Sequence, residues 1–172
     1  VEMDSSKNSG GATKVANYLA SEFSRAGFSE QDVEVIPVAQ TSALVVKYRG
    51  KADSSHSPIL FLGHMDVVEA LAKDWERPPF TLTQDKGYFF GRGTLDNKFG
   101  IAQISGTFIA LKKAGYVPDR DLIIAFSGDE ESGMQSTRYL ARRADLLKAD
   151  YAINTDAGGG VLTDDASAVV YR

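Results

Sequence analysis

The sequence of 172 residues contains no cysteine and only two histidines. The lack of cysteine excludes disulfide bonds and all thiolate chemistry. The chain carries a net charge of −4 and no block of basic residues, which argues against a nucleic-acid binder. It also has neither an apolar run long enough to cross a bilayer nor a basic amphipathic segment. We therefore expect no nucleic acid and no membrane among its partners.

Apolar residues recur with helical and strand periods along the chain. A spacing of four places Val15, Leu19 and Phe23 on one face of a helix predicted at 12–26, and a stronger helical pattern covers 99–115. Short apolar runs predict strands at 33–38, 42–50, 57–63, 121–128, 150–156 and 167–172, with a hairpin at 80–93 and a helix at 134–147. Because strands alternate with helices, we expect an α/β three-layer sandwich, in which a mostly parallel central sheet has helices on both faces.

Ionisable residues follow three of the expected strands where the apolar runs end. His64 and Asp66 follow the strand expected at 57–63, and Asp129, Glu130 and Glu131 follow the one at 121–128. Asp156 ends the strand expected at 150–156. In an open α/β sheet, ligands bind beyond the carboxyl ends of the strands, which lie at one edge. We therefore expect this edge to gather the imidazole of His64 and the carboxylates of Asp66, Asp96, Asp129, Glu130, Glu131 and Asp156.

Carboxylates gathered at one edge raise each other's pKa and destabilise the fold unless a cation neutralises them. One histidine among several carboxylates suits zinc, or a similar divalent ion, better than the all-oxygen sites of magnesium and calcium. His64 and Asp66 lie on the same side of an extended chain, so Asp66 can hold the imidazole in its metal-binding tautomer. The side chains of Glu130 and Glu131 diverge, so that one can bind metal while the other acts as general base.

Four motifs carry a resemblance to a known family. The segments GHMDVV, GRGTLDNKFG, SGDEESG and NTDAGG, in this order, resemble the zinc metallopeptidase family M20. This family includes aminoacylase, carboxypeptidase G, acetylornithine deacetylase and succinyl-diaminopimelate desuccinylase. The resemblance runs from about residue 10 to the end of the chain, and four motifs in order at strand ends are far more specific than any one of them.

The resemblance implies a hydrolase of amide or peptide bonds with two zinc ions, for which cobalt or manganese can substitute. It implies that Glu130 is the general base, that Asp66 orients His64, and that a cis peptide bond follows Asp96. The implied metal ligands are His64 and Asp156 in the first site, Glu131 in the second, and Asp96 bridging the two. The substrate class implied is a small peptide or an N-acyl amino acid.

The family pattern also contains parts that this sequence does not match. The family has a further histidine ligand near its C-terminus, and a lid domain that mediates dimerisation. His56 lies in a polar loop and is expected to be exposed, so it does not match that ligand. We therefore expect residues 1–172 to be the N-terminal part of a catalytic domain, with at most one tightly bound zinc and negligible activity alone. The full-length protein is expected to be a homodimer.

Two alternatives to an enzyme remain open from the residues themselves. The acidic edge of such a sheet can form a magnesium-binding regulatory module, or the fold can serve as a non-catalytic scaffold. His64 and the adjacent pair Glu130–Glu131 argue against the magnesium module, because an all-oxygen site needs no imidazole. Asp129 is expected to be structural. The sequence leaves periplasmic, secreted and cytoplasmic locations open.

Overall fold

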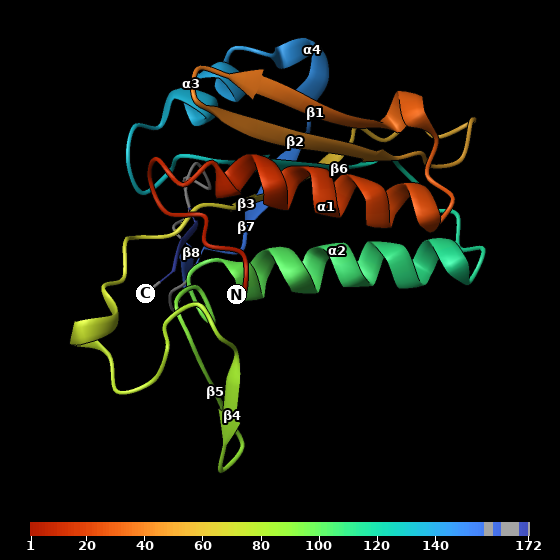
Figure 1. Ribbon diagram of the computed structural model, residues 1–172. Coiled ribbons are helices and arrows are strands. Elements are labelled where there is room, and N and C mark those ends of the chain that lie inside the picture. The colour runs from red at the N-terminus through yellow and green to blue at the C-terminus, as the bar shows by residue number, and fades with distance from the viewer. Residues whose placement is uncertain (157–159, 163–168, 172) are drawn as a thin grey trace.

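A mixed five-stranded sheet forms the centre of the protein (Figure 1). The computed structural model describes residues 1–156, 160–162 and 169–171. The strand order is β1-β2-β6-β3-β7, and only β2 runs against the other four. The strands are β1 (Val33–Val38), β2 (Thr41–Tyr48), β3 (Ile59–His64), β6 (Leu122–Ser127) and β7 (Tyr151–Asn154). The predicted mostly parallel sheet is confirmed, with β3 parallel to both β6 and β7.

Helices cover both faces of this sheet, as the alternation of elements predicted. Helices α1 (Gly11–Arg25) and α2 (Lys98–Lys113) pack on one face, while α3 (Gln135–Ala141) and α4 (Ala144–Leu147) pack on the other (Figure 1). The single helix predicted at 134–147 is therefore two helices. The backbone of Arg143, at φ −97° and ψ 58°, leaves the helical region between them.

Strand β2 shows why the sheet has two cores. Leu44, Val46 and Tyr48 point toward α1 and α2, whereas Ala43 and Val45 point toward α3. All five are at most 2% exposed. A strand that is apolar on both faces alternates between two layers of helices, which is why its sequence reads as a continuous apolar run.

The predicted hairpin is present and projects from the body of the molecule (Figure 1). Its strands are β4 (Thr83–Asp85) and β5 (Tyr88–Phe90). Lys86 and Gly87 both have positive φ, at 47° and 84°, which matches the two-residue turn that glycine favours in hairpins. A second pair of short antiparallel strands, β8 (Gly160–Leu162) and β9 (Val169–Tyr171), lies within the expected last strand and the segment before it.

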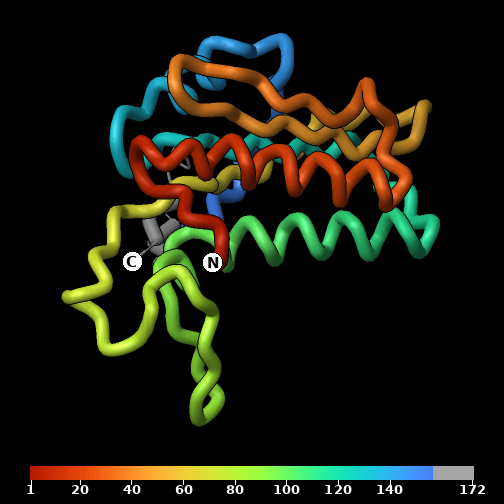
Figure 2. The backbone as a smooth tube through the Cα atoms, viewed as in Figure 1, coloured from red at the N-terminus to blue at the C-terminus, as the bar shows by residue number. Residues whose placement is uncertain are grey.

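The remaining elements are short. Two 3₁₀ turns, η1 (Glu30–Asp32) and η2 (Ala72–Asp74), lie in the connections. The tube in Figure 2 shows the N-terminal segment running beside the start of α2. Among the helices that the structure describes, none combines the length and the apolar character needed to cross a bilayer.

Candidate metal centre

The predicted site residues meet at the carboxyl ends of the parallel strands. His64 is the last residue of β3, Glu130 and Glu131 follow β6, and Asp156 follows β7. Two groups of possible metal ligands share His64, and the ligand atoms within each group lie within 4.8 Å of one another. One group is His64, Asp96 and Glu131, and the other is His64, Glu130 and Asp156. An imidazole nitrogen among carboxylate oxygens is a donor set that fits zinc.

The ring of His64 is buried and held in one orientation. Its Nδ1–H donates to the backbone carbonyl of Asp66 at 3.0 Å, and the Asp66 Oδ1 lies 3.4 Å from the same nitrogen. Because a carbonyl oxygen only accepts, Nδ1 carries a proton in both the neutral and the protonated ring, so Nε2 is the nitrogen that can give up its proton and bind a metal. Nε2 faces Oδ1 of Asp96 at 2.8 Å and Oδ1 of Asp156 at 3.7 Å. The nitrogen that faces the carboxylates is therefore the one available to a metal.

The carboxylate of Asp66 makes a connection that the sequence did not reveal. Its Oδ1 accepts from the backbone N–H of Glu130 and its Oδ2 from that of Glu131, each at 3.0 Å. Asp66 is only 3% exposed, and these two bonds satisfy its buried charge. Asp66 thus ties the loop after β3 to the loop after β6, besides contacting His64.

Asn97 has a role that the sequence analysis missed. It is fully buried; its Oδ1 accepts from the backbone N–H of His64 at 3.2 Å, and its Nδ2 donates to the carbonyl of Thr155 at 2.7 Å. The bond between Asp96 and Asn97 is cis, as the family resemblance implied. A Cβ atom at Gly63 would lie 2.8 Å from Asn97 Oδ1, so only glycine lets Asn97 reach between the strand ends. In the sequence, the available signal for a role of Asn97 was that it directly follows Asp96.

The charges at this edge shift the pKa of several groups in the metal-free chain. Burial lowers the pKa of His64, but the carboxylates of Asp66, Asp156 and Asp96 more than reverse this and raise it to about 9. Desolvation raises the pKa of Glu130 and of Glu131, and neighbouring carboxylates raise both further. The edge is therefore short of positive charge, which a divalent cation would supply.

Asp129 and His56 lie outside this cluster of ligands. The carboxylate of Asp129 accepts from the backbone N–H of Gln135 at 2.7 Å and of Ser136 at 2.9 Å, in the first turn of α3. These bonds stabilise a helix start, so the predicted structural role of Asp129 is confirmed. His56 is exposed in its polar loop, as expected.

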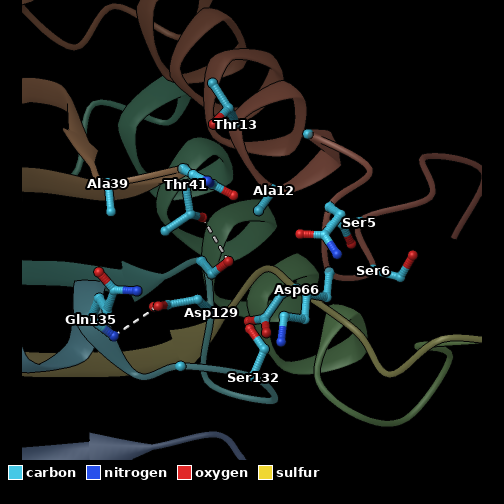
Figure 3. Close-up of a pocket in the computed structure, with 16 residues that line it drawn as sticks. Ser5, Ser6, Ala12, Thr13, Ala39, Thr41, Asp66, Asp129, Ser132 and Gln135 are labelled. Carbon is cyan, nitrogen blue, oxygen red and sulfur yellow. Dashed lines mark hydrogen bonds between the residues drawn. The ribbon is translucent and has the colours of Figure 1, made fainter.

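A polar cavity of about 400 Å³ lies next to the ligand cluster. Its lining includes Ser5, Thr13, Thr41, Asp66 and Asp129. In Figure 3, Asp66 lies between Asp129 on one side and Ser5 with Ser6 on the other. Of the predicted catalytic and metal-binding residues that the structure describes, only Asp66 lines this cavity. The cavity therefore adjoins the metal centre but does not contain it.

A mostly parallel α/β sheet with a histidine–carboxylate cluster at its carboxyl edge defines a metallopeptidase-type domain. Residues 60–170 match the peptidase family M20/M25/M40, and the chain belongs to this family. It is 34% identical over 147 residues to a probable succinyl-diaminopimelate desuccinylase of Staphylococcus aureus, covering 84% of this chain and 35% of the relative. It is 35% identical over 112 residues to the bovine N-fatty-acyl-amino acid synthase/hydrolase PM20D1, covering 64% and 22%.

Solved structures show the same fold. The di-peptidase Dug1p of Saccharomyces cerevisiae superposes with a TM-score of 0.75 at 22% identity, covering 91% of this chain and 36% of that one. The M20 family metallo-carboxypeptidase Sso-CP2 of Sulfolobus solfataricus gives a TM-score of 0.72 at 22% identity, covering 86% and 33%. The chain thus spans about a third or less of the length of the relatives described here.

Proposed function

We propose that this chain supplies part of the catalytic centre of a metal-dependent hydrolase of amide or peptide bonds. The observation that carries this proposal is the convergence of carboxylates from three loops on Nε2 of His64, a nitrogen that a hydrogen bond to Asp66 leaves free for a metal. Family membership supports the same chemistry. The excess of negative charge at this edge favours the binding of a cation.

The residues divide into metal ligands and a proton carrier. The proposed first zinc site takes His64, Asp96 and Asp156, and the second takes Asp96 and Glu131. Zinc bound there would make a water molecule acidic and polarise the amide carbonyl. Glu130 would accept the proton of the attacking water and pass it to the leaving amine.

The names of the relatives support a substrate class. They describe a probable succinyl-diaminopimelate desuccinylase, an N-fatty-acyl-amino acid synthase/hydrolase and a di-peptidase. We propose a small peptide or an N-acyl amino acid as substrate, and a homodimer for the full-length protein. A full-length protein that binds zinc but hydrolyses neither N-acyl amino acids nor dipeptides would favour the scaffold alternative instead.

The metal site is tested by exploiting the two histidines of the chain. After equilibration with zinc and removal of excess ion, elemental analysis should find about one tightly held zinc per chain, because three protein ligands are the usual minimum for catalytic zinc. His64→Ala should hold none, whereas the matched control His56→Ala should hold as much as the unaltered chain. Equal zinc in both variants would overturn the proposed site. Preference for magnesium over zinc would favour the regulatory module.

A further inference from the structure

The first residues of the chain are fastened beside the metal centre. Residues 3–7, which we call the strap, are attached at two points. The Nζ of Lys98 in α2 donates to the carbonyl of Met3 at 2.6 Å. Ser5, which is 1% exposed, donates from its Oγ to the carbonyl of Met65 at 2.8 Å, and its own carbonyl accepts from the N–H of Val67 at 3.3 Å. The strap therefore pairs with the chain on both sides of Asp66.

The strap is also packed directly against α1. A Cβ atom at Gly11 would lie 1.7 Å from the carbonyl oxygen of Asp4 and 2.7 Å from the Cα of Ser5, so no side chain fits between helix and strap. Within the strap, the carboxylate of Asp4 accepts from the N–H of Ser6 at 2.9 Å and from its hydroxyl at 2.7 Å. The backbone of the strap is thus fixed by contacts on three sides: α1, α2 and the loop after β3.

The residue enclosed by these contacts organises the metal centre. Asp66 holds His64 through its carbonyl at 3.0 Å, and holds Glu130 and Glu131 through its carboxylate at 3.0 Å each. Bonds from Ser5 fix the peptide groups on either side of Asp66, so they limit rotation of its backbone. A shift of the strap would therefore reach His64 through one intervening residue.

We propose that Ser5 and Lys98 are positioning residues of the metal centre, which act by holding the strap against the loop that carries Asp66. This inference rests on the proposed function, because it assigns a purpose to the strap at the metal site. Neither residue belongs to the proposed ligand set. Residues that orient metal ligands through hydrogen bonds commonly change metal affinity by about 10- to 100-fold when removed.

Substituting Lys98 tests the proposal, because the two explanations of its role predict opposite changes in zinc affinity. Its ammonium group interacts electrostatically with Asp66, so it lies close enough to repel a zinc ion bound at the metal centre. If Lys98 mattered only through its charge, Lys98→Met would strengthen zinc binding, because a repelling cation is removed. If Lys98 anchors the strap, the same variant should weaken zinc binding. Ser5→Ala changes no charge and should weaken it as well.

The experiment measures zinc affinity by calorimetry in the 172-residue chain and its variants. Ser5→Ala and Lys98→Met are each expected to weaken zinc binding by about 10-fold. The matched control is Ser42→Ala, which removes another buried serine hydroxyl, one whose 2.9 Å hydrogen bond to Thr13 lies outside the strap. It should leave zinc affinity within about twofold, even where it lowers the melting temperature as much as Ser5→Ala does.

Hydrogen exchange in the metal-free chain separates this inference from the proposed function. Ser5→Ala and Lys98→Met should accelerate exchange of the amides of Val67, Glu130 and Glu131, whereas Ser42→Ala should not. If the unaltered chain binds zinc and both strap variants bind it equally well, the positioning role is wrong and the proposed function stands. If no chain binds zinc but exchange responds as expected, the proposed function fails, while the role of the strap in positioning the loop that carries Asp66 is upheld. Unchanged exchange at these amides in both strap variants overturns the inference in either case.

Discussion

Charged residues gather at both ends of the main sheet, but their charges are balanced differently. At the end where β6 and β7 begin, arginines lie against carboxylates. Arg49 lies 2.7 Å from Asp32 and 3.1 Å from Asp121, and Arg120 lies 3.2 Å from Asp150. In these three pairs, two cations face three anions. Each pair has one side chain that is at least half exposed, so water weakens the attraction and each pair contributes little to stability.

At the opposite end the balance is much more negative. One imidazole, that of His64, faces the carboxylates of Asp66, Asp96 and Asp156 at 3.4, 2.8 and 3.7 Å. Burial and neighbouring carboxylates also raise the pKa of Glu130 and of Glu131. The two ends therefore differ in how far the cations of the protein balance its carboxylates. The first end carries ion pairs near the surface, while the second gathers possible metal ligands around His64.

The largest expected effect separates two adjacent residues at the negative end. In the full-length protein, Glu130→Ala should keep its zinc and lose turnover by about two to four orders of magnitude, because it removes the proposed proton carrier. Glu131→Ala should lose zinc from the second site as well. Metal analysis and steady-state kinetics on both variants provide the measurement. Equal zinc content together with equal residual activity would contradict the assignment.

Zinc itself should stabilise the chain by a smaller but still large amount. A free zinc concentration of 100 times the Kd adds about 2.7 kcal/mol to the free energy of unfolding, provided that the unfolded chain does not bind it. The melting temperature should rise with zinc concentration in the unaltered chain and stay constant in His64→Ala. A rise of equal size in both would show that zinc acts elsewhere than at the negative end.

Proton competition at His64 should make zinc binding depend on pH. Because the pKa of His64 is about 9 in the metal-free chain, its imidazole is protonated at neutral pH and must lose a proton to bind zinc. Affinity should therefore rise by about 10-fold per pH unit between pH 6 and 8 and level off above pH 9. Calorimetry in buffers of different ionisation enthalpy should detect about one proton released at pH 7. A flat affinity profile would contradict the raised pKa.

The stability of the metal-free chain should change with pH in the opposite direction to its zinc affinity. The folded pKa of His64 is raised above its ordinary value of 6.5, so its contribution to stability is fully present below pH 6.5 and is lost as pH rises through about 9. Saturating zinc should remove this loss. Denaturant unfolding at pH 6, 7.5 and 9, with and without zinc, compares the two forms, and parallel profiles would argue against His64 as the ligand.

The sequence predicted the negative end better than it predicted how that end is held together. The ligand residues follow apolar strands in chain order, and the carboxyl-end rule brings those positions together without further information. The bonds from Asp66 to the amides of Glu130 and Glu131 depend on the relative height of two loops, which no local pattern encodes. The role of Asn97 and the strap contacts of Ser5 were missed for the same reason.

The opposite end of the sheet was not predicted at all. Arg49 and Asp121 are far apart in sequence and meet only because β2 and β6 are neighbours in the sheet. Surface charges of this kind carry no periodicity, so their pairing follows from topology alone. The division of the helix predicted at 134–147 was likewise missed, because it depends on the backbone conformation of a single residue, Arg143.

Removing one charge from each end should give small effects of opposite sign, which sharpens the comparison most directly. Glu131→Gln should slightly stabilise the metal-free chain at pH 8, because the raised pKa shows that folding disfavours the ionised carboxylate; with zinc bound it should destabilise. Arg49→Met should destabilise both forms alike by about 0.5 kcal/mol, because it breaks the two ion pairs of Arg49 with Asp32 and Asp121, which lie near the surface. Salt at about 0.5 M should shrink the effect of Arg49→Met, since exposed pairs are screened. Denaturant unfolding of both variants, with and without zinc, measures all four values. If both substitutions shifted stability in the same direction in the metal-free chain, the two ends would not differ in charge balance as the structure indicates.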